Sequence, residues 1–152
     1  MKLEYNGQEK VQATAETVWG FIQDPKKVAS CLPDLKSVEI KDDRNMVATV
    51  GVAVGPVRGS FKFNIELDPR PADNQVQVKI RGGGLGSAVD LTASADIQGQ
   101  ADQTTLLDWK GEAKVSGPAA TVGGRVLDAQ AKRLIEAVFA NMSKKMGEAQ
   151  LA

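Results

Sequence analysis

The sequence predicts an α+β fold in which a curved antiparallel β-sheet wraps around a long C-terminal α-helix, with two short helices after the first strand. Three observations lead to this class. Seven segments alternate apolar and polar residues with the period of two that is typical of half-buried strands. Two short helical segments lie between the first and second of these strands. Only the C-terminal segment repeats apolar residues at three- and four-residue steps over a long stretch, which indicates an amphipathic helix.

The first strand and the two short helices are the most N-terminal elements. Residues 3–11 alternate between apolar and polar side chains and are predicted to form the first strand. Thr14 is a favoured N-cap residue and predicts a helix over residues 15–23. Asp24 and Pro25 begin a second short helix, because aspartate caps helices and proline suits the first helical position.

Six strands and the long helix follow. The strands are predicted at residues 37–41, 46–54, 57–67, 76–80, 89–97 and 107–115. A Gly-Pro pair then starts a helical pattern that runs from Ala119 to Met146, roughly 40 Å at ~1.5 Å per residue. An antiparallel sheet with one apolar face needs cover on that face only. The economical topology is therefore a strand meander that curls around this helix, which is the helix-grip arrangement.

A single domain accounts for the chain. Its 152 residues fit one domain, and the sequence has neither a repeat nor a linker. We assign residues 1–147 to the helix-grip domain and residues 148–152 to a short C-terminal tail. The N-terminus lacks the apolar segment of a signal peptide, and no stretch approaches the ~20 apolar residues that cross a bilayer. We therefore expect a cytoplasmic protein.

The composition excludes several classes of function. Nineteen Lys and Arg residues balance 19 Asp and Glu residues, so the chain has no basic surplus for binding nucleic acid. It contains no histidine and one cysteine, Cys31. This removes Ser-His-Asp and Cys-His catalysis, histidine metal sites and a disulfide framework. We expect no nucleic-acid partner, no metal, no cofactor and no catalytic residue.

Small residues gather on the predicted inner face of the sheet. They are Ala48, Gly59, Gly82, Ala93, Ala95, Gly111 and Ala113. Two interpretations remain open at this point. The first is tight contact between the helix and strongly bent strands. The second is an unfilled apolar space between sheet and helix, which in a densely packed interior usually has an occupant.

Two segments resemble a known family. Residues 24–33, DPKKVASCLP, resemble the DP-x-x-V-A-x-C-x-P signature of the CoxG family, named for the G subunit of carbon monoxide dehydrogenase. Residues 52–61, VAVGPVRGSF, resemble the V-x-V-G-P-V-x-G-x-F segment of the same family. The first seven residues, the Val18-Trp19 pair and the Gly117-Pro118 helix start also match, so the resemblance covers nearly the whole chain. The family belongs to the START-like (SRPBCC) superfamily, which implies a START-like helix-grip domain.

The resemblance implies a binding function. START-like domains hold apolar small molecules between the sheet and the long helix. CoxG proteins are associated with molybdenum-containing carbon monoxide dehydrogenases, and are implicated in recruiting that enzyme to the membrane and in handling a quinone. We therefore expect a protein that binds a quinone or lipid-like molecule and is not an enzyme. The alternatives are an enzyme of the START-like cyclase type and an adaptor that docks a molybdenum hydroxylase complex.

The resemblance also bears on location. Members that recruit their enzyme to the membrane carry an extension after the core domain, whereas this sequence ends without an apolar tail. We expect no stable membrane anchor. A peripheral position at the inner membrane face would then depend on a partner.

The ligand site is predicted between the sheet and the helix. Nine apolar residues are expected to form its wall: Phe61, Phe63, Ile80, Leu91, Trp109, Val126, Leu127, Ile135 and Phe139. Glu9 lies on the apolar side of the first strand, where a buried carboxylate is costly unless it is paired. A contact between Glu9 and a polar group of the ligand is one interpretation. The other is that Glu9 reaches solvent or an arginine.

Overall fold

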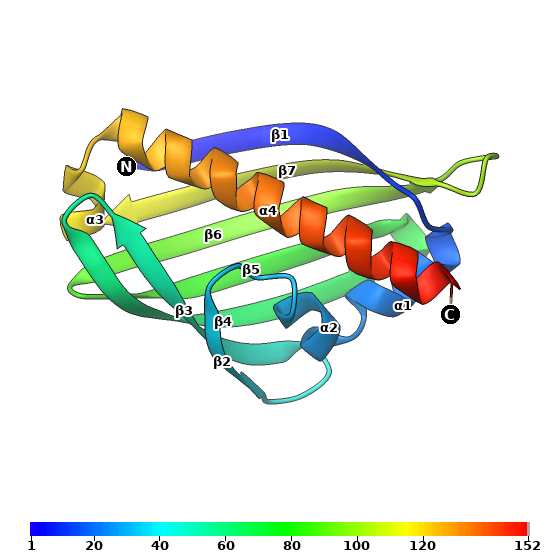
Figure 1. Ribbon diagram of the computed structural model, residues 1–152, viewed down its shortest axis with the longest axis horizontal. Coiled ribbons are helices and arrows are strands. Elements are labelled where there is room, and N and C mark those ends of the chain that lie inside the picture. The colour runs from blue at the N-terminus through cyan, green and yellow to red at the C-terminus, as the bar shows by residue number, and fades with distance from the viewer. Residues whose placement is uncertain (152) are drawn as a thin grey trace.

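A seven-stranded antiparallel sheet covered by a long helix forms the molecule (Figure 1). The computed structural model describes residues 1–151, the last two by their backbone only. The strands are β1 (Lys2–Val11), β2 (Leu35–Ile40), β3 (Asn45–Val54), β4 (Val57–Arg70), β5 (Gln75–Gly84), β6 (Ser87–Gly99) and β7 (Thr105–Ser116). Their order across the sheet is β1-β7-β6-β5-β4-β3-β2. The predicted meander is therefore confirmed, with β1 added beside β7.

The helices lie at the ends of the sheet and across it. They are α1 (Ala15–Ile22), α2 (Pro25–Ala29), α3 (Pro118–Thr121) and α4 (Gly124–Leu151), with a 3₁₀ turn η1 (Pro71–Asp73). α4 crosses the sheet from the end that holds α3 to the end that holds α1 (Figure 1). The helix-grip fold is thus confirmed. α4 continues without a break past residue 147, where the sequence analysis places the start of a C-terminal tail.

The two short helices begin as their sequences predict. The Thr14 side chain accepts a hydrogen bond from the backbone N–H of Thr17 at 3.3 Å. The Asp24 carboxylate accepts from the N–H groups of Lys26 and Lys27 at 3.0 and 3.4 Å. Both side chains satisfy donors that the first turn of a helix leaves without an intrahelical acceptor.

The long helical pattern is interrupted near its start, contrary to the prediction. α3 ends at Thr121, and α4 begins at Gly124 after Gly123, whose φ is +98°. A left-handed φ is inexpensive only for glycine. The periodicity of the apolar residues carries across this break because one short helical turn precedes it. The pattern alone therefore did not reveal two helices.

Strands β4 and β5 are longer than predicted. β4 runs on to Arg70, beyond its predicted end at residue 67, and η1 follows it directly. The three glycines at residues 82–84 continue β5, and the turn to β6 follows at Leu85 and Gly86. A Cβ atom added to Gly82 would lie 2.0 Å from the carbonyl oxygen of Lys62. Glycine is thus required there because the backbones of β4 and β5 approach too closely for a side chain.

The buried core is divided into three separate clusters. The α1 cluster joins α1 to the far end of α4 and includes Val11, Phe21 and Met146. The α2 cluster packs α2 on β3 and β4, and the α3 cluster packs the start of α4 on β7. A single-domain protein usually has one contiguous core. Here the middle of the inner face belongs to none of the three buried sets.

The solvent-accessible surface is larger than expected for a compact chain of this mass. A compact monomer of 16.1 kDa is expected to expose about 7,400 Å². The structure exposes 8608 Å². Side chains in the middle of the inner face are half-buried instead of buried.

A pair of neighbouring glycines tests the break before α4. We expect Gly123→Ala to lower the free energy of unfolding by about 1–2 kcal/mol, because alanine is strained at φ +98°. Gly124→Ala is the matched control, since a Cβ atom at either position would meet no atom within 4 Å. Because Gly124 is the first residue of α4, Gly124→Ala should leave the free energy of unfolding unchanged or raise it. Chemical denaturation measures both variants, and equal effects would contradict the assignment.

Candidate functional site

The middle of the inner face forms an open apolar floor beneath α4. Four strands place their side chains side by side there: Tyr5 of β1 lies opposite Gly111 of β7, Gly111 opposite Ala93 of β6, and Ala93 opposite Val78 of β5. All four residues are half-buried. We call the space above them, between these strands and α4, the central hollow.

Gly111 lies on a part of this floor that α4 does not contact. A Cβ atom added to Gly111 would meet only the Ala93 side chain at 3.6 Å and the Thr92 carbonyl oxygen at 3.7 Å. No atom of α4 lies within 4 Å of that position. The small residues therefore have two causes: Gly82 permits close backbone contact, whereas Gly111 and Ala93 leave space between sheet and helix.

Both ends of the central hollow are closed by buried clusters. The α3 cluster contains Leu127 near the start of α4, and the α1 cluster contains Met146 near its end. Between these anchors, Ala131, Ile135, Val138 and Met142 of α4 are only half-buried. They follow the three- and four-residue spacing of one helix face. The helix is therefore buried most deeply near its two ends, and these four side chains between them are only partly covered.

Two contacts close the hollow along β1. The Tyr5 hydroxyl donates a hydrogen bond to the Asp128 carboxylate at 2.9 Å. Burial is the main cause that raises the pKa of Tyr5 to about 12, and the hydrogen bond to Asp128 adds to it. The same hydrogen bond, followed by one from Lys132, lowers the pKa of Asp128. A neutral phenol and an ionised carboxylate thus tie β1 to α4 at neutral pH.

Trp109 forms the second contact on this side. Its ring lies 5.4 Å from that of Phe139 on α4, with 38° between the ring planes. The indole edge that carries the nitrogen rests on Gly7, where an added Cβ atom would come within 3.2 Å of Nε1. The Nε1 atom is buried and has no hydrogen-bond partner in the described part of the chain. An unpaired buried donor is uncommon and calls for an explanation.

The predicted wall residues occupy three kinds of position. Leu91, Trp109, Ile135 and Phe139 are half-buried around the central hollow. Phe63 and Ile80 pack against the α2 cluster, Leu127 is buried in the α3 cluster, and Phe61 is buried beside Phe63 with 6.1 Å between the rings.

Val126 does not fit the predicted wall. It is 39% exposed. Nine residues separate it from Ile135, so at about 100° per residue the two side chains point to opposite sides of α4. The half-buried Ile135 lies on the inner side, and Val126 therefore faces away from the sheet. Val126 and Leu127 are neighbours in the apolar pattern, but adjacent side chains of a helix point about 100° apart, so both cannot face the sheet.

Glu9 lies where the sequence predicts, on the inner side of β1 and opposite Leu107. It is half-buried and forms no side-chain hydrogen bond or ion pair with the described residues. A contact between Glu9 and a ligand stays a prediction. The sequence alone does not predict the Tyr5–Asp128 contact, because this pairing depends on how α4 lies over β1.

Comparison with known proteins identifies the family. The sequence pattern of CoxG, the G subunit of carbon monoxide dehydrogenase, matches residues 7–147. The chain belongs to the CoxG family. Among curated proteins, no sequence is significantly similar to it.

Solved structures agree with the fold of this CoxG-family chain. A conserved protein from Geobacillus kaustophilus is 27% identical, with 97% of each chain covered and a TM-score of 0.87. A START superfamily protein from Mycobacterium smegmatis is 18% identical, with 96% of this chain and 98% of that chain covered and a TM-score of 0.74. The Zhui aromatase/cyclase from Streptomyces is 16% identical, with 96% and 94% covered and a TM-score of 0.69. The last two likenesses concern the fold.

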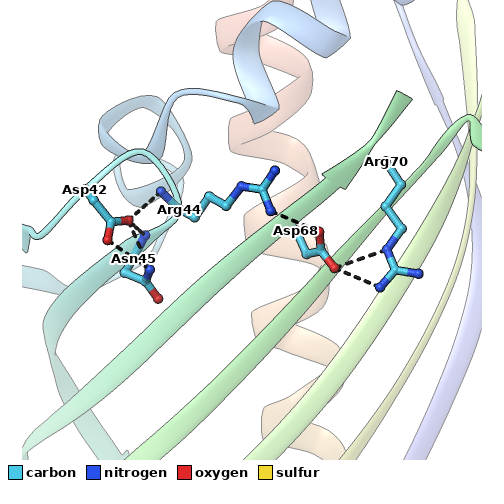
Figure 2. Close-up of polar contacts among 5 residues, drawn as sticks. All are labelled: Asp42, Arg44, Asn45, Asp68 and Arg70. Atoms are coloured by element: carbon cyan, nitrogen blue, oxygen red, sulfur yellow. Dashed lines mark hydrogen bonds and ion pairs between the residues drawn. The ribbon is translucent and has the colours of Figure 1, made fainter. Parts of the chain in front are cut away.

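Outside the central hollow, the CoxG-family chain carries a polar network around the turn between β2 and β3 (Figure 2). The Asp42 carboxylate accepts hydrogen bonds from the backbone N–H groups of Arg44 and Asn45, both at 2.8 Å. Asp68 pairs with Arg44 at 3.5 Å and with Arg70 at 2.9 Å. These contacts hold the turn against β4 and are exposed, so they contribute little to stability. No group of three or more metal-ligating side chains occurs in the described residues.

Two shallow depressions lie on the opposite face of the sheet. One, of about 570 Å³, is bordered by Lys2, Arg81, Asp90 and Lys114. The other, of about 460 Å³, is bordered by Glu4, Asn6, Thr92 and Ser94 and by the intervening residues Tyr5, Ala93 and Gly111. Both are open to solvent and carry outward-facing polar side chains. The central hollow is the better candidate for an apolar ligand. In the described residues, no helix has the length and apolarity that a bilayer span requires.

The single tyrosine of the CoxG-family chain permits a direct test of the β1–α4 contact. We expect its ultraviolet titration to have a midpoint near pH 12 in the folded protein, above the ordinary 10.0. Because the folded-state pKa is raised, the contribution to stability is complete below pH 10 and is lost as the pH rises towards 12. Asp128→Asn should lower the midpoint only in part, since burial is the larger cause. A midpoint at the ordinary value would contradict the contact.

Proposed function

We propose that this CoxG-family chain binds a hydrophobic small molecule, a quinone or a lipid-like compound, in the central hollow. The observation that carries the proposal is the space over Gly111, which no atom of α4 fills. Apolar side chains around this space are left half-buried. A ligand that covers them gains about 2.5 kcal/mol for each 100 Å² of apolar surface removed from water.

The unpaired indole N–H of Trp109 favours a ligand with a hydrogen-bond acceptor. A quinone carbonyl is such an acceptor, and its ring system would lie against apolar side chains. The indole edge now rests on Gly7, so the ring must tilt away from β1 to present its N–H to a ligand. Gly7 has no side chain that would oppose this movement.

A binding function agrees better with these residues than catalysis does. The likeness to the Zhui aromatase/cyclase concerns the fold and carries no chemistry to this chain. Tyr5 is held neutral by its raised pKa, which makes it a poor proton donor or acceptor near neutral pH. Glu9 has no side-chain partner among the described residues with which it could form an acid–base pair. We therefore propose that the chain is not an enzyme.

The family name supports a partner. We propose that the chain serves a molybdenum-containing carbon monoxide dehydrogenase, to which it carries or presents the bound molecule. We place it in the cytoplasm, with contact to the inner membrane face through that partner. An adaptor that only docks the enzyme would have no use for the central hollow, so ligand binding distinguishes the two roles.

A pair of variants on β6 tests the proposed site. We expect Ala93→Trp to abolish the binding of menadione and palmitate, because the indole would occupy the hollow. Thr92→Trp is the matched control, since Thr92 is next to Ala93 in β6 and its exposed side chain lies on the outer face of the sheet. Isothermal titration calorimetry measures binding. Equal affinity in wild type and Ala93→Trp would reject the site.

Thermal unfolding of Ala93→Trp checks the space itself. A large side chain forced into a filled core costs about 1–3 kcal/mol. In an open hollow it should be accommodated, with a midpoint of unfolding equal to or above that of wild type. A strong loss of stability would show that the inner face is already filled.

The proposed hydrogen bond to the ligand is tested by a variant that removes the indole donor and by a compound that lacks the acceptor. We expect Trp109→Phe to weaken menadione binding roughly 5- to 30-fold, which is the range for one lost hydrogen bond in a buried site. Binding of 2-methylnaphthalene, which has no carbonyl group, reports the loss of ring surface alone. An equal loss for both compounds would contradict a hydrogen bond from Trp109.

A further inference from the structure

The two long sides of α4 are attached to the sheet in different ways. Along β1 and the neighbouring β7, the hydrogen bond from Tyr5 to Asp128 and the contact between the tilted rings of Trp109 and Phe139 join helix and sheet. These contacts involve side chains on both elements, and aromatic surface is buried between them. A ligand that entered from this side would have to separate them.

Along β3 and α2, the hydrogen bonds of α4 come from polar side chains near its two ends. The Gln130 amide donates to the carbonyl oxygen of Ala53 in β3 at 3.3 Å. Near the other end, Asn141 donates to the carbonyl oxygen of Cys31 at 3.0 Å, and Lys145 to that of Ser30 at 2.9 Å. Single hydrogen bonds of this kind are worth about 1 kcal/mol each.

Between Gln130 and Asn141 this side of α4 has no hydrogen bond to the rest of the described chain. The eleven-residue separation corresponds to about 16 Å along the helix. We call this stretch, between α4 and the side of β3 and α2, the window. It lies beside the half-buried Val138, whose neighbours line the central hollow.

Leu134 lies on the rim of the window. It follows Gln130 by four residues and precedes Asn141 by seven, so helical spacing places the three side chains on the same side of α4. Leu134 is 47% exposed and is among the most exposed large apolar residues of the described chain. An exposed leucine at the border of an apolar space lowers the cost of moving an apolar molecule out of water.

The attachment of α4 allows the window to widen. At its N-terminal end the helix follows Gly123, which has a left-handed φ and no atom within 4 Å of an added Cβ. At its C-terminal end the Asn141 and Lys145 contacts are made by side chains that can rotate away without breaking backbone structure. The middle of this side of α4 can therefore move away from α2 while Met146 stays buried in the α1 cluster and the contacts to β1 are kept.

We propose that the hydrophobic ligand enters and leaves through the window, with Leu134 on its rim and the Asn141 hydrogen bond as its latch. The proposal rests on the proposed function, because it concerns the route to that binding site. It commits to the side of α4 that faces β3 and α2, and excludes the side along β1.

The test measures rates as well as affinity. N-phenyl-1-naphthylamine, an apolar fluorescent dye, serves as the probe in stopped-flow mixing and displacement. A side chain on the route raises the barrier in both directions and leaves the end states alike. We expect Leu134→Trp to lower the association and dissociation rates together, roughly fivefold or more, with Kd within about twofold of wild type.

Two further variants complete the experiment. Arg133→Trp is the matched control. Arg133 is the residue next to Leu134 in α4, and its side chain is exposed. It should keep wild-type rates. Asn141→Ala removes the latch and should raise both rates. It also keeps the proposal testable if Leu134→Trp folds poorly.

The outcomes separate the two proposals. Dye binding with unchanged rates in both Leu134→Trp and Asn141→Ala would overturn the window and leave the binding site standing. Equal slowing in Leu134→Trp and Arg133→Trp would also overturn it. Absence of saturable dye binding by the wild-type protein would reject the central hollow itself, and the window with it.

Discussion

The way α4 is held at its two ends determines the rest of this structure. Leu127 is buried on β7 at one end and Met146 against α1 at the other. Between these two buried ends the helix crosses the curved sheet (Figure 1). The backbone of α4 approaches α1, β1 and β3, and the strands between β1 and β3 curve away beneath it. Neither anchor alone would keep the helix above the floor, so both are needed for the space to exist.

The floor remains open because of side-chain size on a few strands. Gly111 and Ala93 lie opposite each other in the register and are too short to reach the helix. Larger side chains at these two positions would let the sheet meet α4 and would complete a conventional core. The protein instead exposes more surface than a chain of its mass requires. This arrangement costs stability, and it is understandable if another molecule covers the surface for part of the time.

Local signals in the sequence were sufficient for most of the fold. Alternation identified all seven strands, and Thr14 and Asp24 marked the starts of the short helices because capping depends on residues close in sequence. The break at Gly123 was missed, since a single left-handed residue does not disturb an apolar pattern. The site was only partly predictable for a similar reason. Which inner residues stay uncovered depends on where α4 lies, and so does the pairing of Tyr5 with Asp128. No short segment contains that information.

The division of the core into three clusters has a consequence for folding. Small domains usually unfold in one cooperative step because their core is continuous. Here the α1, α2 and α3 clusters meet across an unfilled centre, so each can loosen with limited effect on the others. A bound molecule would touch all three neighbourhoods and act as the missing part of the core. The occupied protein should then melt as a single unit, while the empty one opens in parts, and hydrogen exchange along the chain would distinguish the two.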